Sequence, residues 1–283
     1  MKKLLITGGS GFLGRRIADY YENKYEVFAP SHNEMDITNR ENVIEKIQSI
    51  TPDCIIHCAA ISDVAFCEKE PERAWKINVD GSRNIAEAAK DIAATCILCS
   101  SDQVYYGSTW NKAHDEDEVL EPCNLYGKGK LAAEQKCLEV NPFSILLRLS
   151  WMYDTKSMNE QEHGDFARTV LQKLEMKEML SYPIYDRRGI TYVRDVVQNL
   201  ELAFSLPGGV YNFGAPNDKN TYDMMIEVAK KFGWDTEKIE RNENAFLDNP
   251  RNMTMSQKKI NEHGIYFKTT AEGLMEQLSN HFL

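Results

Sequence analysis

A tyrosine followed four residues later by a lysine is the first feature of this chain that could do chemistry. Tyr126 and Lys130 fall in a segment predicted to be helical over 126–140, where residues i and i+4 share a face. An ammonium group beside a phenol favours the phenolate and lowers the tyrosine pKa from its usual value of about 10. We therefore expect Tyr126 to act as a general acid that Lys130 tunes.

The spacing alone does not select this pair, because Tyr20 and Lys24 show it as well. That copy ends a predicted helix, away from the carboxyl end of any predicted strand, and is interpreted as a solvated surface pair. Tyr126 instead follows a predicted strand, 94–100, that leads into Ser101, Asp102 and Gln103. Ser101 is expected to hydrogen-bond a substrate carbonyl. The alternative for this segment is an ordinary capping turn.

Three glycines near the N-terminus predict a dinucleotide site. Gly8, Gly11 and Gly14 follow the apolar run 3–7 and precede a helical stripe that starts with Phe12 and Leu13. The first glycine permits a tight turn, the second lets the backbone approach a pyrophosphate, and the third lets helix pack on strand. An ordinary glycine-rich turn is the alternative, and the position between strand and helix favours the dinucleotide.

Strands and helices alternate over the first 150 residues and would position these groups. Strands are predicted at 3–7, 25–29, 54–58, 94–100 and 143–149, and helices at 11–21, 40–50, from Pro71 through Ala88, and 126–140. This order predicts an α/β fold with a doubly wound parallel sheet of the Rossmann type. Such sheets bind ligands at the carboxyl ends of their strands.

The pattern changes after Trp151 and predicts a smaller C-terminal substrate-binding lobe. Residues 152–165 are predicted to be irregular, and the tail from Lys258 to consist of short polar elements. Helices are expected at 166–178, 193–204 and 222–232, and a strand at 209–213. We expect a dinucleotide-binding domain over 1–155, to which 190–213 returns, and a substrate-binding lobe of 156–189 and 214–283.

Composition narrows the function classes. Across 283 residues, 33 Lys and Arg against 43 Asp and Glu give a net charge of −10, which disfavours binding to nucleic acid or anionic membranes. No apolar stretch approaches a bilayer span, and the run after Met1 is too short for a signal sequence. The seven cysteines fit buried free thiols in a cytoplasmic protein. No metal site is expected, because the lone CxxC lies in a strand and the histidines are scattered.

Several segments together resemble the extended short-chain dehydrogenase/reductase family. They are 7–14, Cys58-Ala59-Ala60, Ile77-Asn78-Val79, Ser100-Ser101 and Tyr126-x-x-x-Lys130. Three others are similar to the branch of dTDP-4-dehydrorhamnose reductases, namely Met35-Asp36-Ile37-Thr38, 148–153 and Asn249-Pro250-Arg251-Asn252. The resemblance implies that Ser101, Tyr126 and Lys130 are the catalytic trio.

The expected binding residues form two groups. The cofactor group comprises Gly8, Gly11, Phe12, Leu13, Gly14, Ser31, His32, Asp36, Ile37, Ala59, Ala60, Asn78, Tyr126 and Lys130. By the resemblance, Asp36 lies near the adenine. The substrate group comprises Ser62, Asp102, Gln103, Trp151 and Arg251, although simple core packing is an alternative for Trp151.

Taken together, we expect an NAD(P)H-dependent reductase of a keto group, acting on a 4-keto nucleotide sugar. The related 4,6-dehydratases carry a glutamate where Gln103 stands, and an amide cannot exchange the proton that water elimination requires. One alternative is an NADP-binding protein resembling the regulatory subunit of methionine adenosyltransferase; another is a nucleotide-sugar epimerase. A homodimer is compatible with the sequence, which leaves the oligomeric state open.

NADPH is expected rather than NADH. A carboxylate about 20 residues past the glycines usually binds the ribose hydroxyls of NAD. Here Ser31 and His32 occupy the tip of the second predicted strand, and Asp36 comes later, so no carboxylate is expected at that tip to repel a 2′-phosphate. Ser31 can donate a hydrogen bond and His32 can add charge when protonated. Glu34 is the main objection, because a small loop shift would turn it toward the ribose.

Overall fold

The computed structural model describes residues 1–108, 112–158, 162 and 164–282. Over these residues, a six-stranded parallel sheet has the order β10-β5-β4-β3-β1-β2. Its strands are β1 (Lys3–Thr7), β2 (Glu26–Phe28), β3 (Cys54–His57), β4 (Thr95–Ser101), β5 (Ile145–Leu149) and β10 (Gly209–Phe213). The predicted α/β fold with a doubly wound sheet is confirmed.

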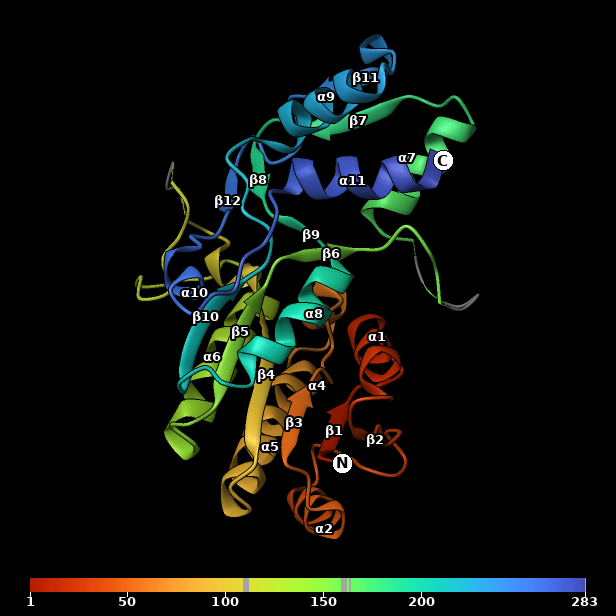
Figure 1. Cartoon of the computed structure of the whole chain (residues 1–283). Coiled ribbons are helices and arrows are strands. Elements are labelled where there is room, and N and C mark those ends of the chain that lie inside the picture. The colour runs from red at the N-terminus through yellow and green to blue at the C-terminus, as the bar shows by residue number, and fades with distance from the viewer. Residues whose placement is uncertain (109–111, 159–161, 163, 283) are drawn as a thin grey trace.

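Helices cover both faces of the sheet (Figure 1). One face packs against α1 (Phe12–Tyr21) and α8 (Val193–Ala203), and the other against α2 (Arg40–Ile50), α5 (Gly81–Asp91) and α6 (Leu125–Val140). Leu4 and Ile6 of β1 point into the first core and Leu5 into the second, as the alternation of a strand requires. Burying each such side chain contributes about 1.5–3 kcal/mol.

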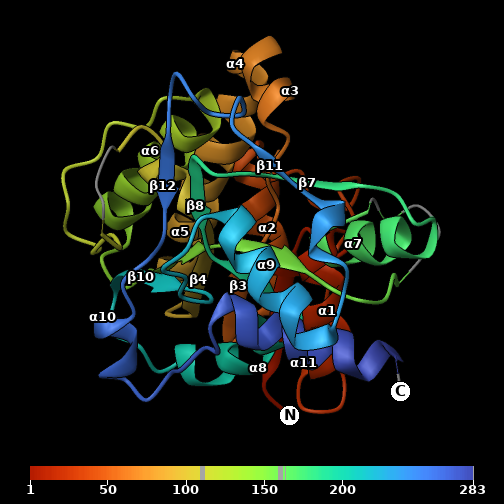
Figure 2. The ribbon, with the colours of Figure 1, turned by 90° about the horizontal axis from the view of Figure 1, so that it is seen from above.

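Most elements after β5 other than α8, β10 and α10 (Lys258–Asn261) form a second layer beyond the carboxyl ends of the sheet strands (Figures 1 and 2). Three pairs of short parallel strands lie here: β6 (Trp151–Tyr153) with β9 (Ile190–Tyr192), β7 (Leu180–Pro183) with β11 (Ile239–Asn242), and β8 (Asp186–Arg188) with β12 (Arg251–Met253). The helices α7 (Phe166–Glu175), α9 (Thr221–Phe232) and α11 (Thr270–Phe282) pack around a separate apolar core.

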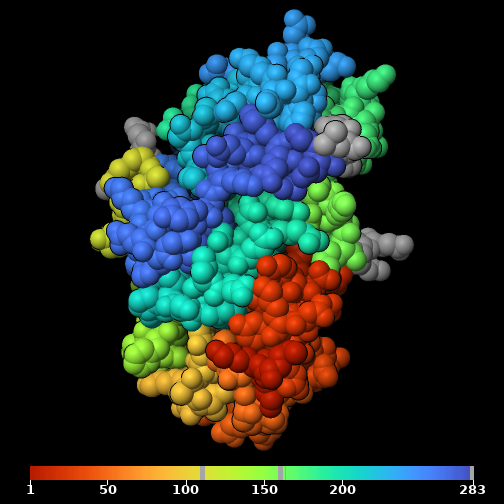
Figure 3. All heavy atoms as spheres, in the orientation of Figure 1, coloured from red at the N-terminus to blue at the C-terminus, as the bar shows by residue number. Residues whose placement is uncertain are grey.

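The C-terminal tail differs from its prediction as short polar elements. It contains the 13-residue helix α11, whose Ala271, Leu274 and Leu278 are buried in the second core. Thr269 and Glu272 cap its start reciprocally, because each side chain accepts a hydrogen bond from the other's backbone amide. In Figure 3 the C-terminal residues, in blue, form a band across the face between the two halves of the molecule.

Two further differences concern the segments that line the site. Residues 151–153 form β6, although 152–165 was predicted to be irregular. The segment after β3 contains a short helix, α3 (Val64–Lys69), that the sequence did not predict. Pro71 starts α4 (Pro71–Trp75), as expected for a first helical turn, and a π-helical turn (Lys76–Asp80) then joins α4 to α5.

Short elements complete the chain. They are the 3-10 turns η2 (Asp102–Tyr105) and η3 (Thr236–Lys238) and the helix α10 (Lys258–Asn261). Ile260 and Ile265, which belong to the predicted second lobe, pack in the core of the sheet. The division into two lobes therefore stays a prediction. Within the described residues, none of the helices is long and apolar enough to cross a bilayer.

Candidate active site

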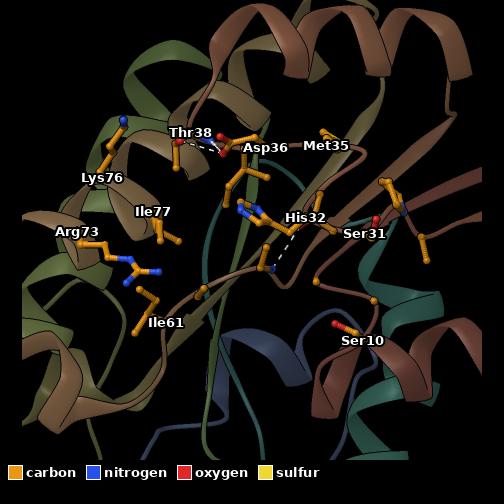
Figure 4. A pocket seen from close by; sticks show the side chains of 18 residues that line it. Ser10, Ser31, His32, Met35, Asp36, Thr38, Ile61, Arg73, Lys76 and Ile77 are labelled. Atoms are coloured by element: carbon orange, nitrogen blue, oxygen red, sulfur yellow. Dashed lines mark hydrogen bonds between the residues drawn. The ribbon is translucent and has the colours of Figure 1, made fainter. Parts of the chain in front are cut away.

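Two adjoining cavities lie at the carboxyl ends of the sheet strands and share Gly8, Ser10 and Ala60 in their walls. The first, of about 480 Å³, lies between the tip of β2 and helix α4; we call it the adenine-side cavity (Figure 4). The second, of about 680 Å³, runs from the glycine turn to the predicted catalytic residues; we call it the catalytic cavity. Both volumes fall in the range of roughly 300–1,000 Å³ that small ligands occupy.

The glycine turn, residues 8–14, joins the two cavities. Each of its glycines meets a different structural constraint. Gly8 has φ +67°, and a Cβ there would lie 2.7 Å from the Ala59 amide nitrogen. A Cβ on Gly14 would overlap the Gly8 carbonyl. Gly9, which the sequence analysis did not use, would place a Cβ 2.7 Å from that of Ala29. Gly11 is different, because its Cβ would meet only the Gly8 oxygen, at 3.3 Å, and Gly11 lines the catalytic cavity.

A series of buried hydrogen bonds holds the ends of β1 and β3 beside this turn. Thr7 Oγ1 lies 2.7 Å from His57 Nδ1, and His57 Nε2 lies 3.0 Å from Ser82 Oγ, which donates to the Asn78 carbonyl. Burial lowers the pKa of His57 to about 3, so its ring is neutral. The Asn78 side chain pairs with both backbone groups of Ile61. Asn78 lies outside both cavities and bears on the adenine-side cavity through Ile61, which lines it.

The predicted catalytic trio converges on the catalytic cavity. Ser101 ends β4, and Tyr126 and Lys130 lie one turn apart on α6. Lys130 Nζ donates to the Cys99 carbonyl at 2.9 Å and lies 5.8 Å from the centroid of the Tyr126 ring. The three side chains come from the ends of adjacent elements, which is the arrangement that the βαβ order predicts.

The start of α6 is fixed by two amides. Asn124 is its N-cap, and its Oδ1 accepts from the Gly127 amide at 2.6 Å. Its Nδ2 donates to Gln103 Oε1 at 2.9 Å. Gln103 lines the catalytic cavity, and its side-chain oxygen Oε1, through Asn124, also helps to position the helix that carries Tyr126.

The expected lowering of the Tyr126 pKa is not what the structure shows. Burial raises the pKa of Tyr126, and a hydrogen-bond interaction with Ser101 only partly opposes this. Burial also lowers the pKa of Lys130. Removing both groups from water penalises their charged forms more than their proximity favours them. Tyr126 is therefore held in its protonated form, which is the form that donates a proton.

The part of the catalytic cavity that contains Asp102 and Trp151 also holds an arginine that the sequence did not predict. Arg188 lies on β8, and its Nη2 donates to Asp102 Oδ2 at 3.1 Å. Its guanidinium stacks over Trp151, with 4.9 Å from its carbon to the ring centroid. Arg188 is 8% exposed, and its Nε has no hydrogen-bond partner among the described residues. All three residues line the cavity.

The contacts of Arg188 change how two predicted substrate residues, Asp102 and Trp151, are interpreted. The Asp102 carboxylate is already engaged by Arg188 and by the Ser101 hydroxyl, at 3.1 Å and 3.3 Å. Trp151 is 42% exposed at the cavity wall, so core packing does not account for it. Ser62 also lines this cavity. Arg251 lies outside it, because its Nε pairs with Asp186 at 2.6 Å.

The adenine-side cavity contains the other predicted cofactor residues (Figure 4). Asp36, Ile37, Ser31, His32 and Ala59 line it. Asp36 Oδ1 accepts hydrogen bonds from the backbone amide and the hydroxyl of Thr38. The hydrogen bond from the amide is the largest cause of the lowered Asp36 pKa.

The hydrogen-bond donors of Ser31 are already engaged, which the sequence did not predict. Its amide and its hydroxyl both donate to the Glu34 carboxylate, at 2.8 Å and 2.7 Å. These two bonds lower the pKa of Glu34 and hold a negative charge at the tip of β2. The expectation that no carboxylate stands at this tip is therefore wrong.

Arg73 is a second basic residue that the sequence analysis missed. It lies on α4, lines the adenine-side cavity and points into it, whereas Lys76 points away (Figure 4). Its only sequence signal was its position near the start of the helix that Pro71 begins.

Comparison with known proteins decides the family. The family described as "RmlD substrate binding domain" matches residues 1–281. A dTDP-4-dehydrorhamnose reductase of Aggregatibacter actinomycetemcomitans is 32% identical over 238 residues, covering 81% of this chain and 78% of that protein. The chain belongs to the RmlD substrate-binding domain family.

Two further similar proteins bear on the function of this RmlD-family chain. Methionine adenosyltransferase 2 subunit beta of Xenopus tropicalis is 31% identical, covering 82% of this chain and 72% of that protein. The crystal structure of dTDP-4-dehydrorhamnose reductase from Bacillus anthracis in complex with NADP has a TM-score of 0.85 at 24% identity, covering 99% of each chain. The predicted resemblance to extended short-chain reductases is confirmed, and the chain is an NAD(P)-dependent oxidoreductase of that type.

The residues present in this RmlD-family chain fit such a cofactor. Gly11 presents backbone without a side chain to the cavity, at the N-terminus of α1, whose first turn carries no acidic residue. The unsatisfied amides of that turn favour an anion such as a pyrophosphate. The described residues hold no cluster of three or more His, Cys, Asp or Glu placed to bind a metal.

Proposed function

We propose that this protein reduces the keto group of a 4-keto nucleotide sugar with NADPH. The observation that carries the proposal is that Ser101, Tyr126 and Lys130 line one cavity whose other end is the glycine turn. The similarity to a dTDP-4-dehydrorhamnose reductase supports the substrate class. When bound, the cofactor supplies the hydride.

Each residue of the trio has a distinct task in this reaction. Ser101 hydrogen-bonds the carbonyl oxygen and orients it. Tyr126, kept protonated by burial, donates its proton to the alkoxide that develops on that oxygen. Lys130 holds the ribose next to the nicotinamide and supports Tyr126 from the same helix face.

Two alternatives use the same fold. A regulatory protein like the methionine adenosyltransferase subunit would bind the cofactor without turnover, and the trio lining the cavity favours an enzyme. An epimerase would keep its cofactor and reoxidise it in each cycle. Net consumption of NADPH separates both alternatives from a reductase.

The decisive experiment is a screen of NADPH consumption against a panel of 4-keto nucleotide sugars. We expect steady oxidation of NADPH with at least one member and a matching amount of reduced sugar. Binding of NADPH without consumption by any keto sugar would favour the regulatory protein. Conversion of a sugar without net oxidation would favour the epimerase.

Preference for NADPH is a separate prediction that rests on the balance of charges around the adenine-side cavity. Arg73 and His32 favour a 2′-phosphate, whereas Glu34 opposes it. We expect NADPH to bind more tightly than NADH at equal pH and salt. Arg73→Ala should weaken NADPH binding by about tenfold, the scale of one hydrogen bond to a charged group, and leave NADH unchanged.

Glu34→Gln is the matched variant, and it should strengthen NADPH binding because it removes the opposing charge. Dissociation constants from titration of both variants with both cofactors provide the measurement. Equal or tighter binding of NADH by the unmodified protein would overturn the preference and make Glu34 the expected ribose ligand.

Arg188 is expected to position the substrate. Its buried Nε has no partner in the described structure, its Nη2 is held by Asp102 and its guanidinium lies over Trp151, so a sugar oxygen can satisfy Nε. Arg188→Gln should raise KM for the keto sugar about tenfold or more, while the dissociation constant for NADPH changes little.

A double variant separates this role from a structural one. Arg188→Gln leaves the Asp102 charge buried without its partner, which should cost about 3 kcal/mol in the free energy of unfolding. Adding Asp102→Asn should restore much of that stability and should not restore KM. Recovery of KM together with stability, measured by urea unfolding, would show that Arg188 only supports the fold.

We further propose a reducing, cytoplasmic setting. It is supported by the seven cysteines, all of which are free thiols in the structure. Cys54, Cys67, Cys96 and Cys137 are buried as expected, whereas Cys123 is exposed and Cys58 and Cys99 are partly exposed.

A further inference from the structure

Two partly exposed thiols face each other in the wall of the catalytic cavity. Cys58 follows β3 directly and Cys99 lies in β4, and their sulfur atoms are 3.6 Å apart. Both line the cavity, together with Gly11, Tyr126 and Lys130. Neither thiol has a task in the reaction proposed above, and nothing in hydride transfer requires a sulfur at these positions.

The strand register makes this pair suited to a covalent bond. β3 and β4 are parallel neighbours in which His57 pairs with Leu98, so the next residues along, Cys58 and Cys99, also lie opposite each other. Neighbouring strands are about 4.8 Å apart, which falls within the roughly 4.4–6.8 Å Cα separation of disulfides. The backbone separation therefore permits a disulfide, and the sulfurs must move closer together to form it.

The charges around the pair distinguish its two members. The hydrogen bond with Cys58 is the largest influence lowering the pKa of Cys99, and the Lys130 ammonium acts in the same direction. The pKa of Cys58 is raised, chiefly by that same hydrogen bond and by burial. Cys99 is thus the thiol more readily converted to the reactive thiolate, and Cys58 is placed to resolve it.

We propose that Cys58 and Cys99 form an oxidation site at which hydrogen peroxide closes a disulfide and switches off cofactor binding. The Cys99 thiolate attacks one peroxide oxygen, the O–O bond breaks, and a sulfenic acid forms as the other oxygen leaves as water. The Cys58 sulfur then displaces the sulfenic hydroxyl as a second water. Two thiols are oxidised to one disulfide, and one peroxide is reduced to two waters.

The consequence for the site follows from its geometry. Closing the sulfurs to about 2.05 Å shifts the tips of β3 and β4. The Cys99 carbonyl, which accepts the hydrogen bond from Lys130, lies on one of those tips. Lys130 is the residue proposed above to hold the cofactor ribose, so displacing the carbonyl that it bonds weakens its hold on the cofactor. Cofactor affinity should fall at least tenfold, and bound NADPH should disfavour the disulfide by the same factor, because such coupling is reciprocal.

The test treats the full chain with hydrogen peroxide and follows it by intact mass, by peptide mapping and by titration with NADPH. We expect a loss of two hydrogens, a linked pair of peptides containing Cys58 and Cys99, weaker NADPH binding, and reversal of all three by dithiothreitol. Saturation with NADPH should slow the loss of hydrogens. These readouts need no sugar substrate, so they stand apart from the test of the reductase activity.

Variants provide the controls. Cys123→Ser alters an exposed cysteine outside both cavities and should behave like the unmodified protein. Cys58→Ala and Cys99→Ala should each abolish the link, and Cys99→Ala, which removes the attacking thiol, should preserve NADPH binding after peroxide. A link between other cysteines, or a Cys58–Cys99 link that leaves NADPH affinity unchanged, would overturn the proposal. If either variant fails to fold, peptide mapping and NADPH titration of the unmodified chain still decide it.

Discussion

Replacing Tyr126 by phenylalanine should lower turnover of a keto-sugar substrate by about 100-fold or more, the usual contribution of a positioned general acid. The phenol is buried and stays protonated, so it is a proton donor in the same cavity as Ser101 and Lys130. Phenylalanine keeps the ring and its packing against Cys67 and Ala74. NADPH binding and the free energy of unfolding should therefore change little.

Tyr20→Phe is the matched control, because Tyr20 and Lys24 have the same spacing on a helix. Lys24 pairs with Glu201 at 2.6 Å on the surface, and neither Tyr20 nor Lys24 lines a cavity at the site. This variant should be nearly neutral in steady-state kinetics. Equal turnover of Tyr126→Phe and the unmodified enzyme would remove Tyr126 from the mechanism.

Gly11→Val should abolish NADPH binding in a protein that still folds. The backbone of Gly11 is extended, with φ −76° and ψ 173°, which valine adopts without strain. The first added carbon would meet only the Gly8 oxygen, at 3.3 Å, so a small shift accommodates it. The rest of the side chain would occupy the space that a pyrophosphate needs at the start of α1. Calorimetric titration and circular dichroism report binding and folding separately.

Variants at two other glycines serve as controls for Gly11→Val. Gly14→Val should destabilise the fold, because its Cβ would overlap the Gly8 carbonyl. Gly129→Ala on α6 should leave binding intact and change stability by no more than about 1 kcal/mol, because its Cβ would meet nothing within 4 Å. Undiminished affinity for NADPH in a folded Gly11→Val protein would show that the cofactor does not contact this turn.

Local signals in the sequence were sufficient for the sheet and for the outline of the site. Strand β1 and helix α2 have the predicted bounds, because apolar runs and capping residues act within a few positions of one another. Gly8, with φ +67°, is a backbone requirement that can be read from residue type. The sequence could also predict that Ser101, Tyr126 and Lys130 lie together, because parallel strands deliver their carboxyl ends to one edge.

Packing between distant segments decided the rest. Arg188 meets Asp102 across 86 positions and Cys58 meets Cys99 across 41, and no local pattern encodes either contact. The pKa of Tyr126 followed burial rather than its neighbour Lys130, since the cost of removing a charge from water depends on the whole enclosure. Residue types and short-range spacing thus determined the elements and the chemistry available. Only tertiary structure determined which charges pair, which thiols meet and which proton stays in place, because those outcomes depend on desolvation and contact between segments far apart in the chain.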